Sequence, residues 1–306
     1  MLGIARLADR GPASAAALAA LTLVGAVWLP LVLPTGSLLS MLLIVLSAAV
    51  VAFVILRRGE AAAARAGGVC VAMLIGLSLA LYGSLVQVPL VALVFWLPAV
   101  LAAVVLRRYV SLDLAVLALA VCGAAIAVGV HLFAGEDGGP WREPLTAQLS
   151  AQSSSGLSEE QIEALVDGLS NLMAGAMGVS VMSVALCSLF LARYWQASLV
   201  RPGGFREEFH ALSLGKGAAL ACLVAIALAM LVDGRLWDAL AIVAVFAFFI
   251  QGLAVAHALV RRRGLSRGWL VGLYALLLLP HTLLLLAALG LADNLFRLRG
   301  PGKSSS

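Results

Sequence analysis

The sequence predicts an all-α fold, a polytopic transmembrane helix bundle with eight or nine spans, on three observations. The chain has 306 residues, of which 63% are hydrophobic and 11% are charged, whereas globular proteins average about 45–50% and about 25%. The hydrophobic residues gather in nine runs, each near the ~20 residues that cross a bilayer. The basic residues fall between these runs. A soluble enzyme cannot bury so much apolar surface, and a disordered chain has the opposite composition, so both classes are excluded.

The nine runs occupy residues 13–33, 38–56, 67–86, 88–106, 114–133, 175–191, 217–232, 239–260 and 269–291. The first run is too long for the apolar part of a cleaved signal peptide, so we expect it to remain as a span. Residues 34–37 form a turn signal after it, and Pro89 opens the fourth run, where its missing N–H costs nothing. The seventh run is short, and Lys216 at its edge can extend its amine to the interface.

The basic residues orient the chain. Fifteen of the 20 Lys and Arg residues lie on one side of the predicted spans, and the positive-inside rule makes that side the cytoplasm. The prediction is therefore a multi-pass membrane protein with a cytoplasmic N-terminus. Nine crossings would place the tail, residues 297–306, outside, although it carries three basic residues. Either the other loops outweigh the tail, which is expected to be disordered, or one run does not cross.

We treat residues 1–306 as a single membrane domain with one long extracytoplasmic loop, residues 134–174. The first half of this loop is rich in Gly, Pro and Ser, which predicts irregular structure. The second half begins at Ser158 with the pattern of a capping box completed by Gln161. An apolar stripe at helical spacing follows, so we expect an amphipathic helix that lies on the outer surface or continues into the sixth run.

Residues 193–216 form the densest polar stretch and are predicted to be a cytoplasmic interfacial segment. Phe205, Phe209 and Leu212 recur at the spacing of one helix face, with Arg206 off that face. Such a helix either lies in the membrane interface or docks a partner protein. We expect Glu208 in the same helix to be a solvated carboxylate.

Four polar residues lie in or beside the spans: Gln87, Gln251, His257 and His281. A polar side chain in lipid has an unfavourable free energy, so each needs a partner or a function. They either bond neighbouring helices or contact a ligand or ion. Gln251 and His281 fall near mid-depth of the eighth and ninth runs, so their side chains can approach one another if both face inward. His257 belongs to a different layer.

No pattern in the sequence predicts chemistry. Cys70, Cys122, Cys187 and Cys222 each lie alone in a different run, which favours small buried hydrophobes over a metal site or a disulfide framework. The stretch 215–217, Gly-Lys-Gly, lacks the Ser or Thr and the upstream Gly of a phosphate-binding loop. We expect no catalytic residue, no metal, no cofactor and no nucleic-acid partner, and therefore no enzyme.

Five stretches resemble the proteobacterial branch of the YybS-like family, a domain of unknown function among bacterial multi-spanning membrane proteins. They are ARYWQA at 192–197, RPGGFREEFH at 201–210, FIQGLAVAH at 249–257, LPH at 279–281 and GLADN at 290–294. That family is distantly similar to the substrate-binding S subunits of energy-coupling-factor vitamin transporters. These have about six spans, fewer than the present chain, and bind a vitamin or metal ion.

The resemblance implies a multi-pass protein of the bacterial inner (cytoplasmic) membrane that binds or takes up a small solute. The lipid bilayer is its first partner, and a membrane subunit would have to supply energy, because the sequence has no nucleotide-binding motif. The alternative is a non-transporting envelope protein that organises partner proteins through residues 193–216. A cluster of polar residues that converges near the membrane midplane would favour uptake. Scattered, lipid-facing or singly satisfied polar residues would favour the alternative.

Overall fold

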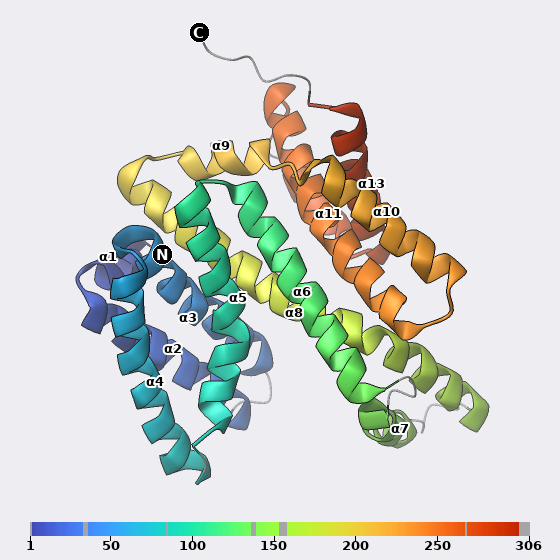
Figure 1. Cartoon of the computed structure of the whole chain (residues 1–306), viewed down its shortest axis with the longest axis horizontal. Coiled ribbons are helices and arrows are strands. Elements are labelled where there is room, and N and C mark those ends of the chain that lie inside the picture. Colours follow the sequence, from blue (N-terminus) through green and yellow to red (C-terminus); the bar gives the residue numbers. More distant parts are fainter. Residues whose placement is uncertain are drawn as a thin grey trace. The chain divides into compact units, whose positions relative to one another are not determined.

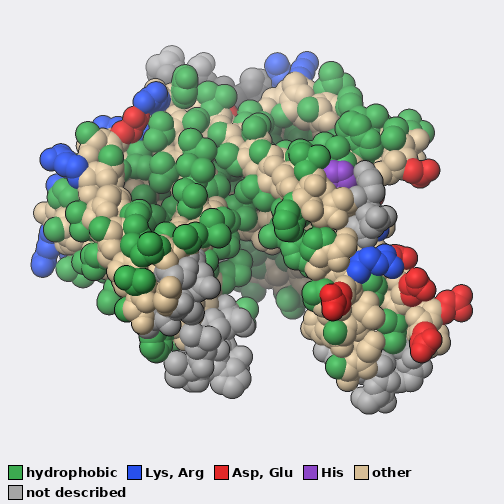
Figure 2. Space-filling model, turned by 60° about the horizontal axis from the view of Figure 1, so that its bottom comes forward, with side chains coloured by type: hydrophobic (Ala, Val, Ile, Leu, Met, Phe, Trp, Pro, Cys, Tyr) green, Lys and Arg blue, Asp and Glu red, His purple; other side chains and the backbone are tan. Residues whose placement is uncertain are grey.

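The computed structural model describes residues 2–32, 36–83, 85–135, 139–152, 158–266 and 268–299. These residues form 13 helices and no strand, which confirms the predicted all-α class. Seven helices are individually long and apolar enough to cross a membrane, and two bent helix pairs raise the number to nine at most. Hydrophobic side chains are spread widely over the face shown in Figure 2, and the charged side chains in this view lie mainly near its edges.

The helices cluster into two compact units, where the sequence predicts a single membrane domain. Unit 1 comprises Met1–Leu119 and Val181–Phe209, and unit 2 comprises Ala120–Ser180 and His210–Ser306. The division runs through helix α8, which has 42 residues and is therefore about 63 Å long, roughly twice the thickness of the hydrocarbon core. The two halves of such a helix cannot share one core.

Unit 1 consists of α1 (Leu2–Asp9), α2 (Pro12–Val32), α3 (Gly36–Arg58), α4 (Glu60–Tyr82) and α5 (Gln87–Tyr109), with the start of α6 (Leu112–Ala134), the second half of α8 (Glu159–Val200) and most of α9 (Gly204–Ala211). Serine hydroxyls join its apolar helices. Ser47 on α3 donates to the Ala19 carbonyl at 2.7 Å, and Ser188 on α8 donates to the Val45 carbonyl at 3.0 Å. Such bonds between helices add to the packing of small residues in membranes.

The C-terminal end of α3 is held by long polar side chains from two other helices. Arg107 of α5 donates to the carbonyls of Ile55 and Leu56 at 2.9 and 2.8 Å, and Gln196 of α8 donates to Leu56 at 3.0 Å. These carbonyls belong to the last turn of α3, where carbonyls lack partners within the helix, although the Ile55 carbonyl also accepts from the amide of Gly59 at 3.0 Å. The contacts fix the ends of α3, α5 and α8 to one another within unit 1.

Unit 2 contains the rest of α6 and the first half of α8, with α7 (Gly139–Gln152), α10 (Gly215–Leu231), α11 (Arg235–Arg262), α12 (Gly268–Leu276) and α13 (Pro280–Phe296). Helices α10, α11 and α13 contact one another and lie side by side in orange and red in Figure 1. The candidate site described below lies at one end of these three helices.

The first half of the predicted loop is helical, which corrects the expectation of irregular structure. Helix α7 has 14 residues and occupies most of that stretch. Pro140 lies in its first turn, where proline is compatible with a helix. Arg142 forms an ion pair with Asp167 of α8, a contact between distant segments that local composition does not reveal.

The capping box at the start of α8 is confirmed. The amide of Gln161 donates to Ser158 Oγ at 3.2 Å, and the amide of Ser158 donates to Gln161 Oε1 at 3.0 Å. From this cap α8 continues unbroken through the sixth run, one of the two arrangements expected from the sequence.

Candidate functional site

A close crossing between α11 and α13 brings their polar residues together. Gly252 on α11 and Gly290 on α13 lie at the crossing. A methyl group on Gly252 would collide with the carbonyl of Leu286, and one on Gly290 would collide with the carbonyl of Phe248. Only glycine permits this approach, a common device between membrane helices. The crossing brings Gln251, beside Gly252, against the C-terminal part of α13.

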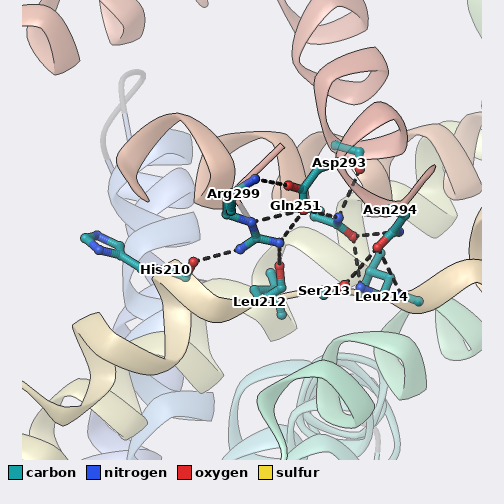
Figure 3. Close-up of polar contacts among 10 residues, drawn as sticks. His210, Leu212, Ser213, Leu214, Gln251, Asp293, Asn294 and Arg299 are labelled. Atoms are coloured by element: carbon teal, nitrogen blue, oxygen red, sulfur yellow. Dashed lines mark hydrogen bonds and ion pairs between the residues drawn. The ribbon is translucent and has the colours of Figure 1, made fainter. Parts of the chain in front are cut away.

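The side chain of Gln251 is fully buried, and four hydrogen bonds hold it. Its Oε1 accepts from the amide of Leu214 at 2.9 Å and from Asn294 Nδ2 at 3.1 Å. Its Nε2 donates to the carbonyl of Gly290 at 2.9 Å and to Asp293 Oδ2 at 3.4 Å. A glutamine amide offers two donors and two acceptor lone pairs, so every bonding position is used within the chain (Figure 3).

Asn294 on α13 holds the segment that connects α9 to α10. Its Oδ1 accepts from Ser213 Oγ at 2.8 Å and from the amide of Gly215 at 3.3 Å. The connection is not helical, so its amides need partners from elsewhere. Asn294 and Gln251 provide them from two other helices (Figure 3).

Arg299, just beyond the C-terminal end of α13, completes the cluster. Its guanidinium pairs with the buried carboxylate of Asp293, with Nε at 3.0 Å from Oδ2. It also donates to the carbonyls of His210 and Leu212, both at 2.7 Å. The guanidinium therefore neutralises a buried acid and binds two carbonyls near the end of α9. The sequence predicts a disordered tail from residue 297, but residues 297–299 are held in place, and residues 300–306 lie outside the described residues.

A cavity of about 390 Å³ adjoins this cluster. Asp293, Asn294 and Arg299 form one part of its wall, and His210 and Ser213 form another. Three further cationic side chains line it: Lys216 at the start of α10, Arg262 at the end of α11 and Arg297 after α13. Its volume falls within the ~300–1,000 Å³ of small-molecule sites.

The shared cavity shows that one face of unit 2 carries the start of α10, the end of α11 and the end of α13. Helix α12 leaves this same face after a connection of a few residues from α11. Between α12 and α13 the chain bends by 118°, directly before Pro280. The ninth run therefore departs from one face of unit 2 and returns to it.

Gln251 and the two histidines expected in the spans do not form one site. Gln251 and His281 do not pair, because His281 is exposed and the bonding positions of Gln251 are filled by other groups. The Nε2 atom of His257 lies 2.9 Å from the Tyr274 hydroxyl. The side chain of Gln87 lies outside the described residues, although its backbone begins α5. Of the three whose side chains are described, only Gln251 lies in the polar cluster.

The predicted apolar stripe of the interfacial segment packs within the chain. The rings of Phe205 and Phe209 are each 5.6 Å from the ring of Phe190, and both side chains are half-buried. Leu212 is fully buried, whereas Arg206 is exposed. The aromatic part of the stripe is therefore packed, at least in part, against α8.

Glu208 is not the solvated carboxylate that the sequence predicts. It forms an ion pair with Arg193 of α8, and the side chains of Glu208 and Arg193 are 32% and 19% exposed. Gln196 also accepts from Arg193 at 2.7 Å. The partner of Glu208 lies 15 residues earlier in the chain, on α8. The sequence around Glu208 does not reveal such a distant contact.

Three residues of the cluster were not expected: Asp293, Asn294 and Arg299. Asp293 and Asn294 directly follow the ninth apolar run, and an arginine follows six residues after the acid. An acid and an arginine at this spacing, at the end of an apolar helix, are a signal for a capped helix end. The sequence places Arg299 in a basic tail, because two of its partners, the carbonyls of His210 and Leu212, lie far away in the chain.

In comparisons with known proteins, no family model, no curated protein and no solved structure matches the chain. Any functional interpretation of the cavity therefore depends on its own geometry.

Proposed function

We propose that the chain is a multi-pass protein of the bacterial inner membrane that binds a small solute and serves in its uptake together with an energising partner. The observation that carries this proposal is the broken ninth run, which returns to the face it leaves beside a cavity of ligand size. Many transporters build their solute sites from interrupted helices. The proposal includes no catalytic reaction and no cofactor.

The break between α12 and α13 is chemically suited to lipid. The amides of Leu277, Leu278 and Leu279 donate to carbonyls three or four residues earlier, at 3.1, 3.2 and 2.9 Å. The side chains of Leu278 and Leu279 are 86% and 56% exposed. An apolar turn with bonded amides can lie at membrane depth, because unbonded backbone there costs several kcal/mol, on the order of 2–7 for each group.

This arrangement also accounts for the basic tail. If the ninth run turns back, eight crossings remain, and the tail and the N-terminus lie on the same side of the membrane. With Arg297, Arg299 and Lys303 added to the fifteen, 18 of the 20 Lys and Arg residues are cytoplasmic. The positive-inside rule then holds for the tail as well, and the cavity opens at the cytoplasmic face.

Two observations favour uptake over a role as an organiser of partner proteins. Gln251, Asp293, Asn294 and Arg299 converge in one cluster beside the cavity. This cluster lies at one end of α13 and not at the predicted midplane. The aromatic side chains proposed for partner docking pack instead on Phe190. An organiser needs an exposed surface more than a cavity.

Native mass spectrometry of the full chain, purified in lipid nanodiscs from its own membrane, tests the proposal. We expect a small molecule to remain bound and to be lost in Ala211→Trp, because Ala211 lines the cavity and the indole would take up space that the molecule needs. Ala151→Trp, at an exposed alanine of α7, is the matched control and should retain the molecule. Absence of any bound small molecule, or equal retention in both variants, would contradict solute binding at this cavity.

A further inference from the structure

Cationic side chains from three separate helix ends meet at the cavity. Lys216, Arg262 and Arg297 are exposed at its wall, at the start of α10, the end of α11 and the end of α13. None of the three forms an ion pair with a carboxylate in the described part of the chain. Their convergence depends on the fold, because each is tens of residues from the next in the sequence.

The one acidic residue at the wall does not offset these charges. Asp293 is 5% exposed, and its carboxylate is paired with Arg299. Four cationic side chains therefore face one carboxylate, which leaves a net charge of about +3 at neutral pH with His210 uncharged. The cavity wall also includes Gly215, at the start of α10, where the helix dipole adds a positive potential.

We propose that this cavity binds an anion through a phosphate group. A phosphate at neutral pH carries up to two negative charges and several acceptor oxygens, and Arg and Lys from different directions satisfy both. The first turn of α10 resembles other helix starts that bind phosphate, although its sequence is not that of a nucleotide-binding loop. If the ligand is the solute that the protein takes up, this inference rests on the proposed function. It then narrows the class of solute to small molecules that carry a phosphate group.

The same chemistry has two sources at the cytoplasmic face. A soluble phosphate ester can enter from the cytoplasm, and an anionic lipid can place its headgroup in the cavity from the membrane. The first is a transported or sensed solute, and the second is a lipid that holds the α9–α10 connection in place. Binding from either source requires Lys216 and Arg262. The two sources differ in which probe binds, a soluble phosphate or a phospholipid.

The test uses the full chain in two kinds of nanodisc and the double variant Lys216→Gln/Arg262→Gln. Binding of radiolabelled inorganic phosphate and of glycerol phosphate is measured in nanodiscs of pure phosphatidylcholine. Retention of phosphatidylglycerol is measured by native mass spectrometry in nanodiscs that contain equal parts of both lipids. The control is Arg261→Gln/Arg263→Gln, which removes the same charge from exposed neighbours that do not line the cavity. Thermal unfolding checks that both variants are folded.

Saturable binding of either phosphate probe that weakens at least tenfold in Lys216→Gln/Arg262→Gln, and less than threefold in the control, would support a soluble ligand. Loss of bound phosphatidylglycerol in the same variant alone, without binding of the soluble probes, would support the headgroup. Failure of all three probes, or equal effects of the two double variants, would overturn the phosphate site. If native mass spectrometry still finds a neutral or cationic molecule in the cavity, the proposed function survives and only the ligand class fails.

Discussion

Replacing Gln251 with leucine should destabilise the protein by about 2–4 kcal/mol. Leucine has nearly the volume of glutamine, so packing changes little, but four hydrogen bonds to Gln251 are lost. Bonds between membrane helices contribute about 0.6 kcal/mol each on average, which gives a lower value of about 2.4 kcal/mol. Buried groups left without a partner cost more, about 1–3 kcal/mol each, and the Leu214 amide is such a group.

The free energy of unfolding is measured for Gln251→Leu by titration with sodium dodecyl sulfate in mixed micelles, followed by circular dichroism. Gln148→Leu is the control, because Gln148 is an exposed glutamine on α7. We expect Gln148→Leu to remain within about 0.5 kcal/mol of the unmodified protein, as surface substitutions usually do. A Gln251→Leu protein equally close to the unmodified one would refute the view that Gln251 holds α10, α11 and α13 together.

Three further predictions concern the elements around the cavity and the interfacial segment. Gly290→Ala should cost about 2 kcal/mol or more in unfolding free energy, because the methyl group collides with a backbone carbonyl; Gly272→Ala, at an open helix position, should be neutral or slightly stabilising, and equal values would contradict the close crossing. Arg299→Gln should make the α9–α10 connection more sensitive to protease, because two carbonyls and a buried acid lose their partner; unchanged cleavage rates would show that the tail does not hold this connection. Phe209→Glu should destabilise the protein by about 2–3 kcal/mol, because a charge enters an aromatic cluster. The control Arg206→Gln should have little effect on stability. A similar small effect of both substitutions would mean that the Phe209 ring is not packed in solution.

The sequence predicts the helices of this chain well, because lipid imposes a length and composition that local residues carry by themselves. Eight of the nine runs each lie mainly in one helix of the described residues, and the ninth is divided between α12 and α13. The capping box at Ser158 has the expected bonds. The break before Pro280 is also a local signal, since proline removes a helical hydrogen bond. The direction that the chain takes after this break is not local, because it depends on how closely α13 can approach α11.

The candidate site was harder to predict from the sequence. Which residues Gln251 contacts depends on where α11 and α13 cross. Gln251 was identified as an expensive polar residue in a span, but its expected partner, His281, is exposed. Its actual partners include Leu214 and Asn294, which the crossing at Gly252 brings within reach. Hydrophobic periodicity assigns a residue to a helix face, and it does not say which helix lies against that face.

The proposed return of α12 and α13 to the cytoplasmic face is tested most directly by locating the two ends of this helix pair. The measurement determines on which side of the membrane each end lies. Single cysteines are introduced as Asp233→Cys, Ser266→Cys and Ser304→Cys in a chain whose four native cysteines are replaced, and intact spheroplasts are treated with an impermeant maleimide. If α12 and α13 form a turn that returns to the cytoplasm, Asp233→Cys is labelled at once, while Ser266→Cys and Ser304→Cys react only after the membrane is permeabilised. Labelling of Ser304→Cys together with Asp233→Cys in intact spheroplasts, with Ser266→Cys protected, would mean that the ninth run crosses the membrane and that the tail does not face the cytoplasm.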